Sequence, residues 1–276
     1  MAIAVAGARA AAARRSPTHV PHPPPRSRSQ EGTILAAARS LRSPDITPEE
    51  EAEGRVADCV GAALSLANVG VTLVPESVFR LVQLQHLDLA GNRLVKLPAG
   101  LAKLPGLLSL NVEGTALESL DGVGRLANLT ALNARSNLLE ALPEELCELP
   151  ALLSLDVGDN ALTALPESLR SLRALEVLRA DRNQLDGVSE AVLELASLRS
   201  LSLGQNKIAA VPPTIARLEK LVILDLADNS LGDLPTELAQ MAELVQIELG
   251  GNPMRCPPQE VYEEGALAIR GFLEDL

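Results

Sequence analysis

The sequence predicts an α/β solenoid, with a curved parallel sheet on its concave side and short helices and 3₁₀ turns on its convex side. Two observations support this prediction. A pattern of the form LxxLxLxxNxL recurs, as in LQHLDLAGNRL from Leu84. The pattern also returns at a nearly fixed period of 22 or 23 residues. Its anchor leucines are Leu84, Leu107, Leu129, Leu152, Leu175, Leu198, Leu221 and Leu244.

Each repeat is expected to contribute one short strand. Side chains alternate between the two faces of a strand, so an inward Leu87 places His86 and Asp88 outward. The inward leucines of successive repeats then form one continuous core beneath a parallel sheet.

An asparagine recurs where the chain turns away from each strand. Its side chain both donates and accepts hydrogen bonds, so it can bond backbone groups that the turn would otherwise leave buried and unpaired. Each buried group left unpaired would cost about 1 to 3 kcal/mol. We therefore interpret these asparagines as a structural ladder and not as catalytic residues. They are Asn92, Asn137, Asn160, Asn183, Asn206, Asn229 and Asn252.

These motifs resemble the leucine-rich repeat family from about Val60 to Leu276. The ending after Asn252, GNP followed by a proline pair, a glycine, AI and FL, is similar to leucine-rich repeat-containing protein forty, Ras-suppressor-like and plant intracellular Ras-group proteins. The segment ILAAARS before a degenerate first repeat, with Val69 at the asparagine position, supports the same group. The resemblance implies a cytoplasmic interaction protein.

Composition and local signals divide the chain into four expected regions. Residues 1–32 form an Ala/Arg/Pro-rich arm that we expect to be disordered. Residues 33–59 are expected to form N-terminal capping helices, 60–256 the repeats, and 257–276 a C-terminal capping helix. In the N-terminal cap, the segment ILAAARSL favours a first helix within 33–41.

The two caps have recognisable helix signals. A capping box at Thr47 and Glu50, with Pro48 at the first helical position, predicts a helix running to about Asp58. At the other end, a proline pair is expected to open one final helix. Its apolar positions are Val261, Leu267, Ile269, Phe272 and Leu273.

Two repeats depart from the common pattern. Thr115 replaces the asparagine of its repeat, and Ser189 stands where other repeats place a proline. We expect these irregularities to alter the local curvature, with a docking site as the alternative.

The charge distribution favours a basic protein partner. The net charge is −12, but residues 1–30 contain five arginines and no acid, so the remainder carries −17. An acidic domain with 1% aromatic residues repels nucleic acid and anionic membranes and lacks stacking platforms for bases.

Compartment signals point to the cytoplasm, with an organelle as the alternative. Cys59, Cys147 and Cys256 match no metal spacing, and the cysteine-clustered caps usual in extracellular members of the resembled family are absent from the sequence. The acid-free arm with Arg9 among alanines is also typical of an organelle transit peptide.

The sequence offers no recognisable catalytic or cofactor site. Two of the three histidines, His19 and His22, lie in the arm. The glycine-containing segments match no phosphate-binding loop motif. We therefore predict a non-enzymatic protein that uses no cofactor, metal or small-molecule substrate.

The concave face is the best candidate for binding. Equivalent positions in adjacent repeats lie about 4.8 Å apart and form columns. The candidate partner-binding residues are His86, Asp88, Asn111, Asn133, Asp156, Arg179, Ser202, Asp225, Asp228 and Glu248. We predict a scaffold or adaptor for a protein partner; the alternative is a regulatory subunit that modulates a small GTPase, phosphatase or ubiquitin ligase.

Charge should be uneven along this face. Asp156 has Arg179 beside it as a counter-ion, whereas Asp225 and Glu248 are adjacent like charges with Asp228 nearby. The C-terminal end is thus expected to meet the basic surface of the partner. An exposed Asp225 should tolerate replacement by lysine without loss of stability.

Overall fold

The computed structural model describes residues 46–276. The predicted disordered arm and the predicted helix within 33–41 lie outside the described residues. Within 46–276, no helix is both long enough and apolar enough to cross a membrane.

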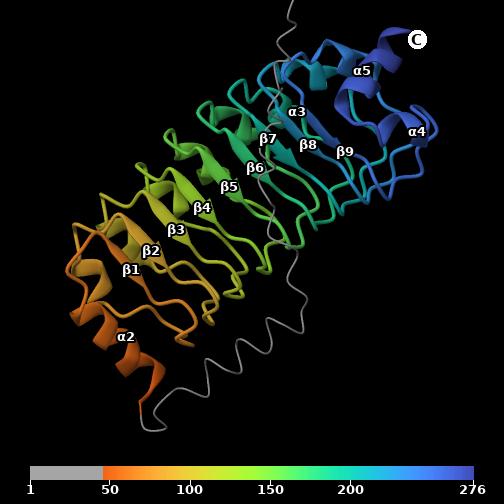
Figure 1. The fold of residues 1–276 in the computed structure, drawn as a ribbon. Coiled ribbons are helices and arrows are strands. Elements are labelled where there is room, and N and C mark those ends of the chain that lie inside the picture. The colour runs from red at the N-terminus through yellow and green to blue at the C-terminus, as the bar shows by residue number, and fades with distance from the viewer. Residues whose placement is uncertain (1–45) are drawn as a thin grey trace, which may run out of the picture. The chain divides into compact units, whose positions relative to one another are not determined.

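A parallel sheet of nine three-residue strands runs through the repeats in sequence order (Figure 1). Each strand pairs with the next at an offset of 23 residues, except β3 and β4, which are offset by 22 at the short repeat. This confirms the predicted solenoid and its register. The strands are β1 (Ala63–Ser65), β2 (His86–Asp88), β3 (Ser109–Asn111), β4 (Ala131–Asn133), β5 (Ser154–Asp156), β6 (Val177–Arg179), β7 (Ser200–Ser202), β8 (Ile223–Asp225) and β9 (Gln246–Glu248).

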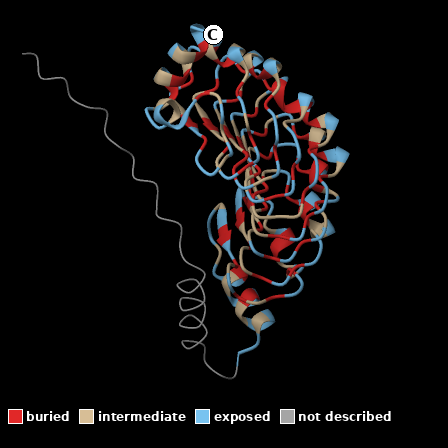
Figure 2. Ribbon diagram, turned by 90° about the vertical axis from the view of Figure 1, so that its right-hand side faces the viewer, coloured by how far each residue is buried: buried red, intermediate tan, exposed pale blue. Residues whose placement is uncertain are grey.

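Short helices carry the chain back along the convex side, seen at the right of Figure 2. Five of them follow a proline in the extended conformation, whose fixed φ suits the turn into the return. They are the 3₁₀ helices η1 (Val78–Arg80), η2 (Ala99–Lys103), η3 (Val123–Arg125), η4 (Glu144–Glu148), η5 (Glu167–Ser171), η6 (Pro213–Arg217) and η7 (Thr236–Gln240), and the α-helix α3 (Glu190–Leu193).

The irregular residue Ser189 gives α3 its different geometry. Its hydroxyl accepts a hydrogen bond from the backbone N–H of Ala191 at 3.2 Å, which is an N-cap that proline cannot provide. The return at this repeat is consequently a turn of α-helix.

The core lies between the sheet and the convex helices and is built mainly from leucine (Figure 2). Leu87 is buried and its neighbour His86 is exposed, as the alternation predicts. One connected apolar cluster extends from Ala52 in the N-terminal cap to Leu273 in the C-terminal cap. Each repeat thus completes its core against its neighbours.

The asparagine ladder joins consecutive repeats. In a typical case, Asn183 donates from Nδ2 to the carbonyls of Val157, at 3.0 Å, and Ala180, at 3.1 Å, and accepts at Oδ1 from Leu162 N–H at 2.9 Å. Val157 and Leu162 belong to the preceding repeat. The predicted structural role is confirmed.

Thr115 preserves the ladder where asparagine is missing. Its hydroxyl donates to Val112 O at 2.8 Å, and it lies 2.9 Å from Oδ1 of Asn137 in the next repeat. Thr115 is fully buried, so its hydroxyl replaces one of the asparagine hydrogen bonds.

The N-terminal cap forms as predicted. Helix α2 (Pro48–Ala57) begins with a complete capping box, in which Glu50 N–H donates to Thr47 Oγ1 and Thr47 N–H donates to the Glu50 carboxylate. Ala52 and Val56 pack on the core and close the first repeat.

The C-terminal cap differs from the prediction of one helix. It consists of α4 (Gln259–Tyr262) and α5 (Ala266–Glu274), separated at Gly265, whose φ of +93° is incompatible with a continuous helix. Ile269 and Leu273 are buried as expected, but Leu267 is 81% exposed because the new helix starts in a different phase.

We predict that Leu155→Ala lowers the free energy of unfolding by about 2 to 5 kcal/mol, because it leaves a cavity between two filled repeats. Leu155 is 0% exposed in β5, whereas the control residue Leu276 is 71% exposed at the chain end. Leu276→Ala should change stability little. Equal shifts of the two denaturant midpoints would contradict this assignment of core and end.

Candidate functional site

The register brings the predicted binding residues together on one face. Asp225 pairs with Glu248, and Asp156 pairs with Arg179, as the spacing predicts. We define the concave face as the column at the last residue of each strand together with its neighbours. That column contains Ser65, Asp88, Asn111, Asn133, Asp156, Arg179, Ser202, Asp225 and Glu248.

Asp228 and His86 lie beside this column. Asp228 belongs to the turn after β8, at a position where the backbone has positive φ in every repeat. His86 lines a shallow hollow of about 430 Å³ with Asp88 and Asn111, at the N-terminal end of the face. The residues with positive φ at the turn are Asn68, Gly91, Gly114, Ser136, Asp159, Arg182, Gln205, Asp228 and Gly251.

Several column residues also shape this turn. The side-chain oxygen of Asp88 accepts a hydrogen bond from Ala90 N–H at 3.1 Å, and Asp225 accepts from Ala227 N–H at 3.0 Å. Asn111, Asn133 and Asp156 accept equivalent hydrogen bonds from the residue two positions ahead. Such local bonds are typical of Asp and Asn at turns. Part of the column pattern is therefore structural, which the sequence reasoning missed.

An arginine that the sequence reasoning missed neutralises the middle of the face. Arg135 bonds both carboxylate oxygens of Asp181, at 3.0 and 2.8 Å, and lies 3.7 Å from Asp156. It reaches across the intervening repeat, where a Cβ on Gly158 would overlap its guanidinium. Arg179, the predicted counter-ion of Asp156, lies farther away at 4.0 Å.

The side chains of this central network are largely buried. The side chains of Arg135, Asp156 and Asp181 are 25%, 15% and 16% exposed. Hydrogen bonding to Asp181 raises the pKa of Arg135 above its ordinary value. Burial raises the pKa of Asp156 despite the opposing hydrogen bond from Gly158 and the nearby Arg135.

The C-terminal end of the face carries the acidic side chains of Asp225, Asp228 and Glu248. Within residues 46–276, Asp225, Asp228 and Glu248 form no ion pair. Asp225 accepts a hydrogen bond from the hydroxyl of Ser202, and Asp228 accepts one from the side-chain amide of Gln205. Glu248 accepts one from the side-chain amide of Gln246. Burial raises the pKa of Asp225, and Glu248 adds to the rise.

Asp225 is less exposed than the sequence suggested. It is partly buried and accepts hydrogen bonds from Ser202 Oγ and Ala227 N–H. Lysine can accept neither bond, so Asp225→Lys is expected to cost stability, contrary to the sequence-based expectation. Asparagine retains the turn bond, as Asn111 and Asn133 do in the same column.

The concave face shows no metal-binding cluster. Across the described part of the chain, no group of three or more His, Cys, Asp or Glu residues is arranged to hold a metal ion.

We predict that Arg135→Met destabilises the protein by about 2 kcal/mol at pH 7, because it leaves two largely buried carboxylates unpaired. The loss should shrink as the pH falls. Without Arg135, the folded-state pKa of Asp156 rises further above its ordinary value of 3.8, so proton uptake favours the folded state at low pH.

Chemical denaturation of wild type and Arg135→Met between pH 7 and pH 4 measures both effects. Arg125→Met is the matched control, because Arg125 is exposed on η3 and forms no ion pair among the described residues. A loss independent of pH would contradict the electrostatic role of Arg135.

Comparison with solved structures gives the same architecture. A leucine-rich repeat protein of Leptospira interrogans matches 72% of this chain at 32% identity with a TM-score of 0.70. This chain spans 51% of that protein, about half its length. Internalin C2 of Listeria monocytogenes matches 68% of this chain at 26% identity, with 80% of its own length covered and a TM-score of 0.61.

A plant receptor shows the same fold in a complex. The ectodomain of an Arabidopsis thaliana membrane receptor kinase, solved with Casparian strip integrity factor 2, matches 66% of this chain at 28% identity with a TM-score of 0.56. The match covers 23% of the receptor chain. Among curated proteins, no match is found.

Family models locate the repeats directly. A model described as leucine rich repeat matches residues 127–185 and 196–254, and a second of the same description matches 83–104. These matches identify the family and do not distinguish the leucine-rich repeat-containing protein forty or Ras-related groups within it. Because they cover more than half of its residues and agree with the nine-stranded solenoid, the chain belongs to the leucine-rich repeat family.

Proposed function

We propose that this protein is a non-enzymatic scaffold or adaptor whose concave face binds a protein partner with a basic surface. The observation that carries the proposal is the unneutralised cluster of Asp225, Asp228 and Glu248 at the C-terminal end of the face. Interaction scaffolding is typical of the leucine-rich repeat fold, which supports the general function.

The contrast between the middle and the end of the face supports this placement. Arg135 already pairs with Asp156 and Asp181, so the charges of those carboxylates are neutralised within the protein. Asp225 and Glu248 lie opposite each other on adjacent strands and repel. A basic side chain placed between them would relieve that repulsion, which an apolar partner would not.

The apolar neighbours of the acidic cluster add contact area. Val222 and Ile223 are partly exposed near Asp225, and Val245, immediately before β9, is 74% exposed. Apolar contacts surrounded by charged groups are a common arrangement at protein interfaces, where charge sets specificity and association rate.

We further propose that the protein acts in the cytoplasm, supported by three partly buried free thiols at Cys59, Cys147 and Cys256. Import into an organelle through the N-terminal arm is the alternative. Fluorescent fusions with and without residues 1–30 distinguish them: an organelle signal that depends on those residues would reject the cytoplasmic assignment.

We predict that Asp225→Asn weakens capture of basic partners about two- to fivefold at low salt, with a smaller effect at high salt. The substitution removes charge but keeps the oxygen that accepts from Ala227 N–H. Pull-down of binding proteins from cell lysate by full-length wild type and Asp225→Asn, across a salt series, measures the change.

Asp88→Asn is the matched control at the opposite end of the face. Asp88 occupies the same column and, like Asp225, accepts from a backbone N–H two residues ahead and from a serine hydroxyl of the preceding repeat. Equal melting temperatures would establish that both variants fold alike. Equal capture by wild type and Asp225→Asn, or equal losses in the two variants, would reject the C-terminal end as the binding region.

A further inference from the structure

The two edges of the sheet differ in whether their outward backbone groups are hydrogen-bonded. At the N-terminal edge, Arg55 of α2 donates from Nη1 to the carbonyls of Ser65 at 3.2 Å and Ala67 at 3.5 Å. The cap helix therefore supplies hydrogen bonds to the outward carbonyls of Ser65 in β1 and of Ala67 in the segment that follows it. An edge occupied in this way is a poor template for another strand.

At the C-terminal edge, the corresponding backbone groups are open. In the preceding repeat, Leu226 N–H donates to Glu248 O at 2.9 Å and Asp228 N–H donates to Gly250 O at 2.7 Å. The equivalent donors one repeat later are Leu249 and Gly251, whose N–H groups face away from β8. No hydrogen-bond partner for either N–H exists within residues 46–276.

An acceptor completes this open row. The carbonyl of Val222 accepts from the N–H groups of Val245 and Gln246, both at 3.0 Å. The equivalent carbonyl one repeat later is that of Val245, and it accepts no hydrogen bond from the described chain. The edge thus offers an acceptor just before β9, at Val245, a donor just after it, at Leu249, and a donor in the following turn, at Gly251.

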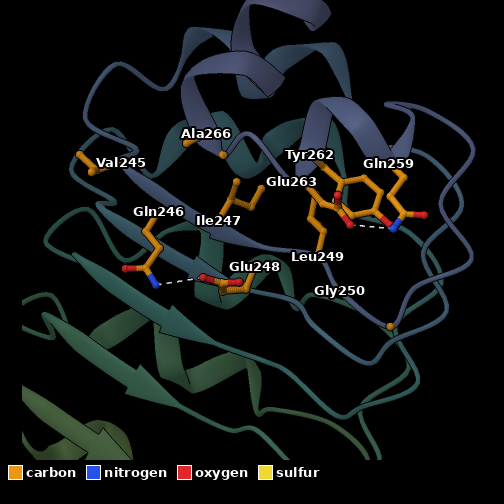
Figure 3. Close-up of a pocket in the computed structure, with 12 residues that line it drawn as sticks. Val245, Gln246, Ile247, Glu248, Leu249, Gly250, Gln259, Tyr262, Glu263 and Ala266 are labelled. Atoms are coloured by element: carbon orange, nitrogen blue, oxygen red, sulfur yellow. Dashed lines mark hydrogen bonds between the residues drawn. The ribbon is translucent and has the colours of Figure 1, made fainter. Parts of the chain in front are cut away.

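A pocket of about 520 Å³ lies along this edge, between β9 and the C-terminal cap (Figure 3). Gly250 and Gly251 line it without side chains, so a second backbone can approach closely. Tyr262 and Ala266 line the opposite wall from α4 and α5. The cap therefore leaves room beside the edge strand.

The charged groups of the pocket are acidic. Its two carboxylates, Glu248 and Glu263, are both exposed. Each is held by a side-chain amide, Gln246 at 3.1 Å from Glu248 and Gln259 at 2.6 Å from Glu263 (Figure 3). An occupant is therefore expected to present lysine or arginine.

We propose that the open edge of β9 binds an extended peptide segment of a partner as a tenth strand, with basic side chains that meet Glu248 and Glu263. Main-chain hydrogen bonds to the edge would supply affinity, and the carboxylates would select the sequence. About five residues would pair with the chain from Val245 to Leu249, before the turn that contains Gly251.

A second copy of this chain is a poorer occupant. Continuing the parallel sheet would require the β1 edge of that copy, where Arg55 already bonds the outward carbonyls of Ser65 and Ala67. Each copy also carries a net charge of −12, so an acidic pocket would meet an acidic molecule. The charge of the pocket favours a basic peptide.

The test uses full-length protein and a seven-residue peptide that alternates valine with arginine. We expect saturable binding by fluorescence anisotropy and slower hydrogen exchange at the amides of Leu249 and Gly251. The same peptide with backbone N-methylation at alternate residues should bind about tenfold more weakly, because it cannot donate to the edge. No binding of the unmodified peptide, or equal binding of both peptides, would overturn the proposal.

Glu263→Lys should weaken peptide binding several-fold, whereas Glu243→Lys is the matched control with the same charge change at an exposed site outside the pocket. Equal effects of the two variants would overturn the assigned pocket.

Self-association blocked by Glu263→Lys would identify a second copy as the occupant and overturn the choice of peptide. Glu263 lies outside the concave columns, so failure here is distinguishable from failure of the Asp225 test.

Discussion

The hydrogen bonds of the asparagine ladder set the geometry on which the other features depend. A single amide, such as that of Asn183, bonds backbone groups in its own repeat and in the preceding one. This fixes each repeat against its neighbour while the leucines fill the space beneath. Because the amide sits at the same place in seven of the turns, and Thr115 replaces part of it in an eighth, the strands stay in register and equivalent side chains form straight columns.

The proposed binding role depends on the charges of the side chains in these columns. Residues two positions beyond the strand include Arg135 and Asp181, which meet across Gly158 and neutralise the middle of the face. Farther along, no arginine or lysine ion-pairs with Asp225 or Glu248 in the part of the chain that the structure describes. The same end of the array carries the open edge of β9. Negative charge and unpaired backbone groups therefore coincide there.

Much of the fold could be predicted from the sequence because it depends on period and local chemistry. The 23-residue spacing gave the pairing of Asp225 with Glu248, and the capping box gave the start of α2 at Pro48. Less could be predicted of the caps. The break at Gly265 depends on a backbone conformation that the apolar pattern does not encode, and it turned Leu267 outward.

The site was predictable only in outline. The 23-residue period predicted which strand positions lie side by side. It did not predict that the side chains of Asp88 and Asp225 also accept hydrogen bonds in the following turn. Arg135 was missed because it lies in a turn column and pairs with a residue two repeats away. A long side chain reaching over a glycine is evident only when three successive repeats are aligned in space.

Native-state hydrogen exchange at the ladder tests the central claim, that asparagine hydrogen bonds between repeats hold the array together. The amides to follow are those of Leu139, Leu162, Leu185 and Ile208, each of which donates to an asparagine of the next repeat. We predict that all four exchange with similar, strong protection, close to that of global unfolding. Exchange at the rate of exposed turns, or protection that differs widely among the four, would contradict the account.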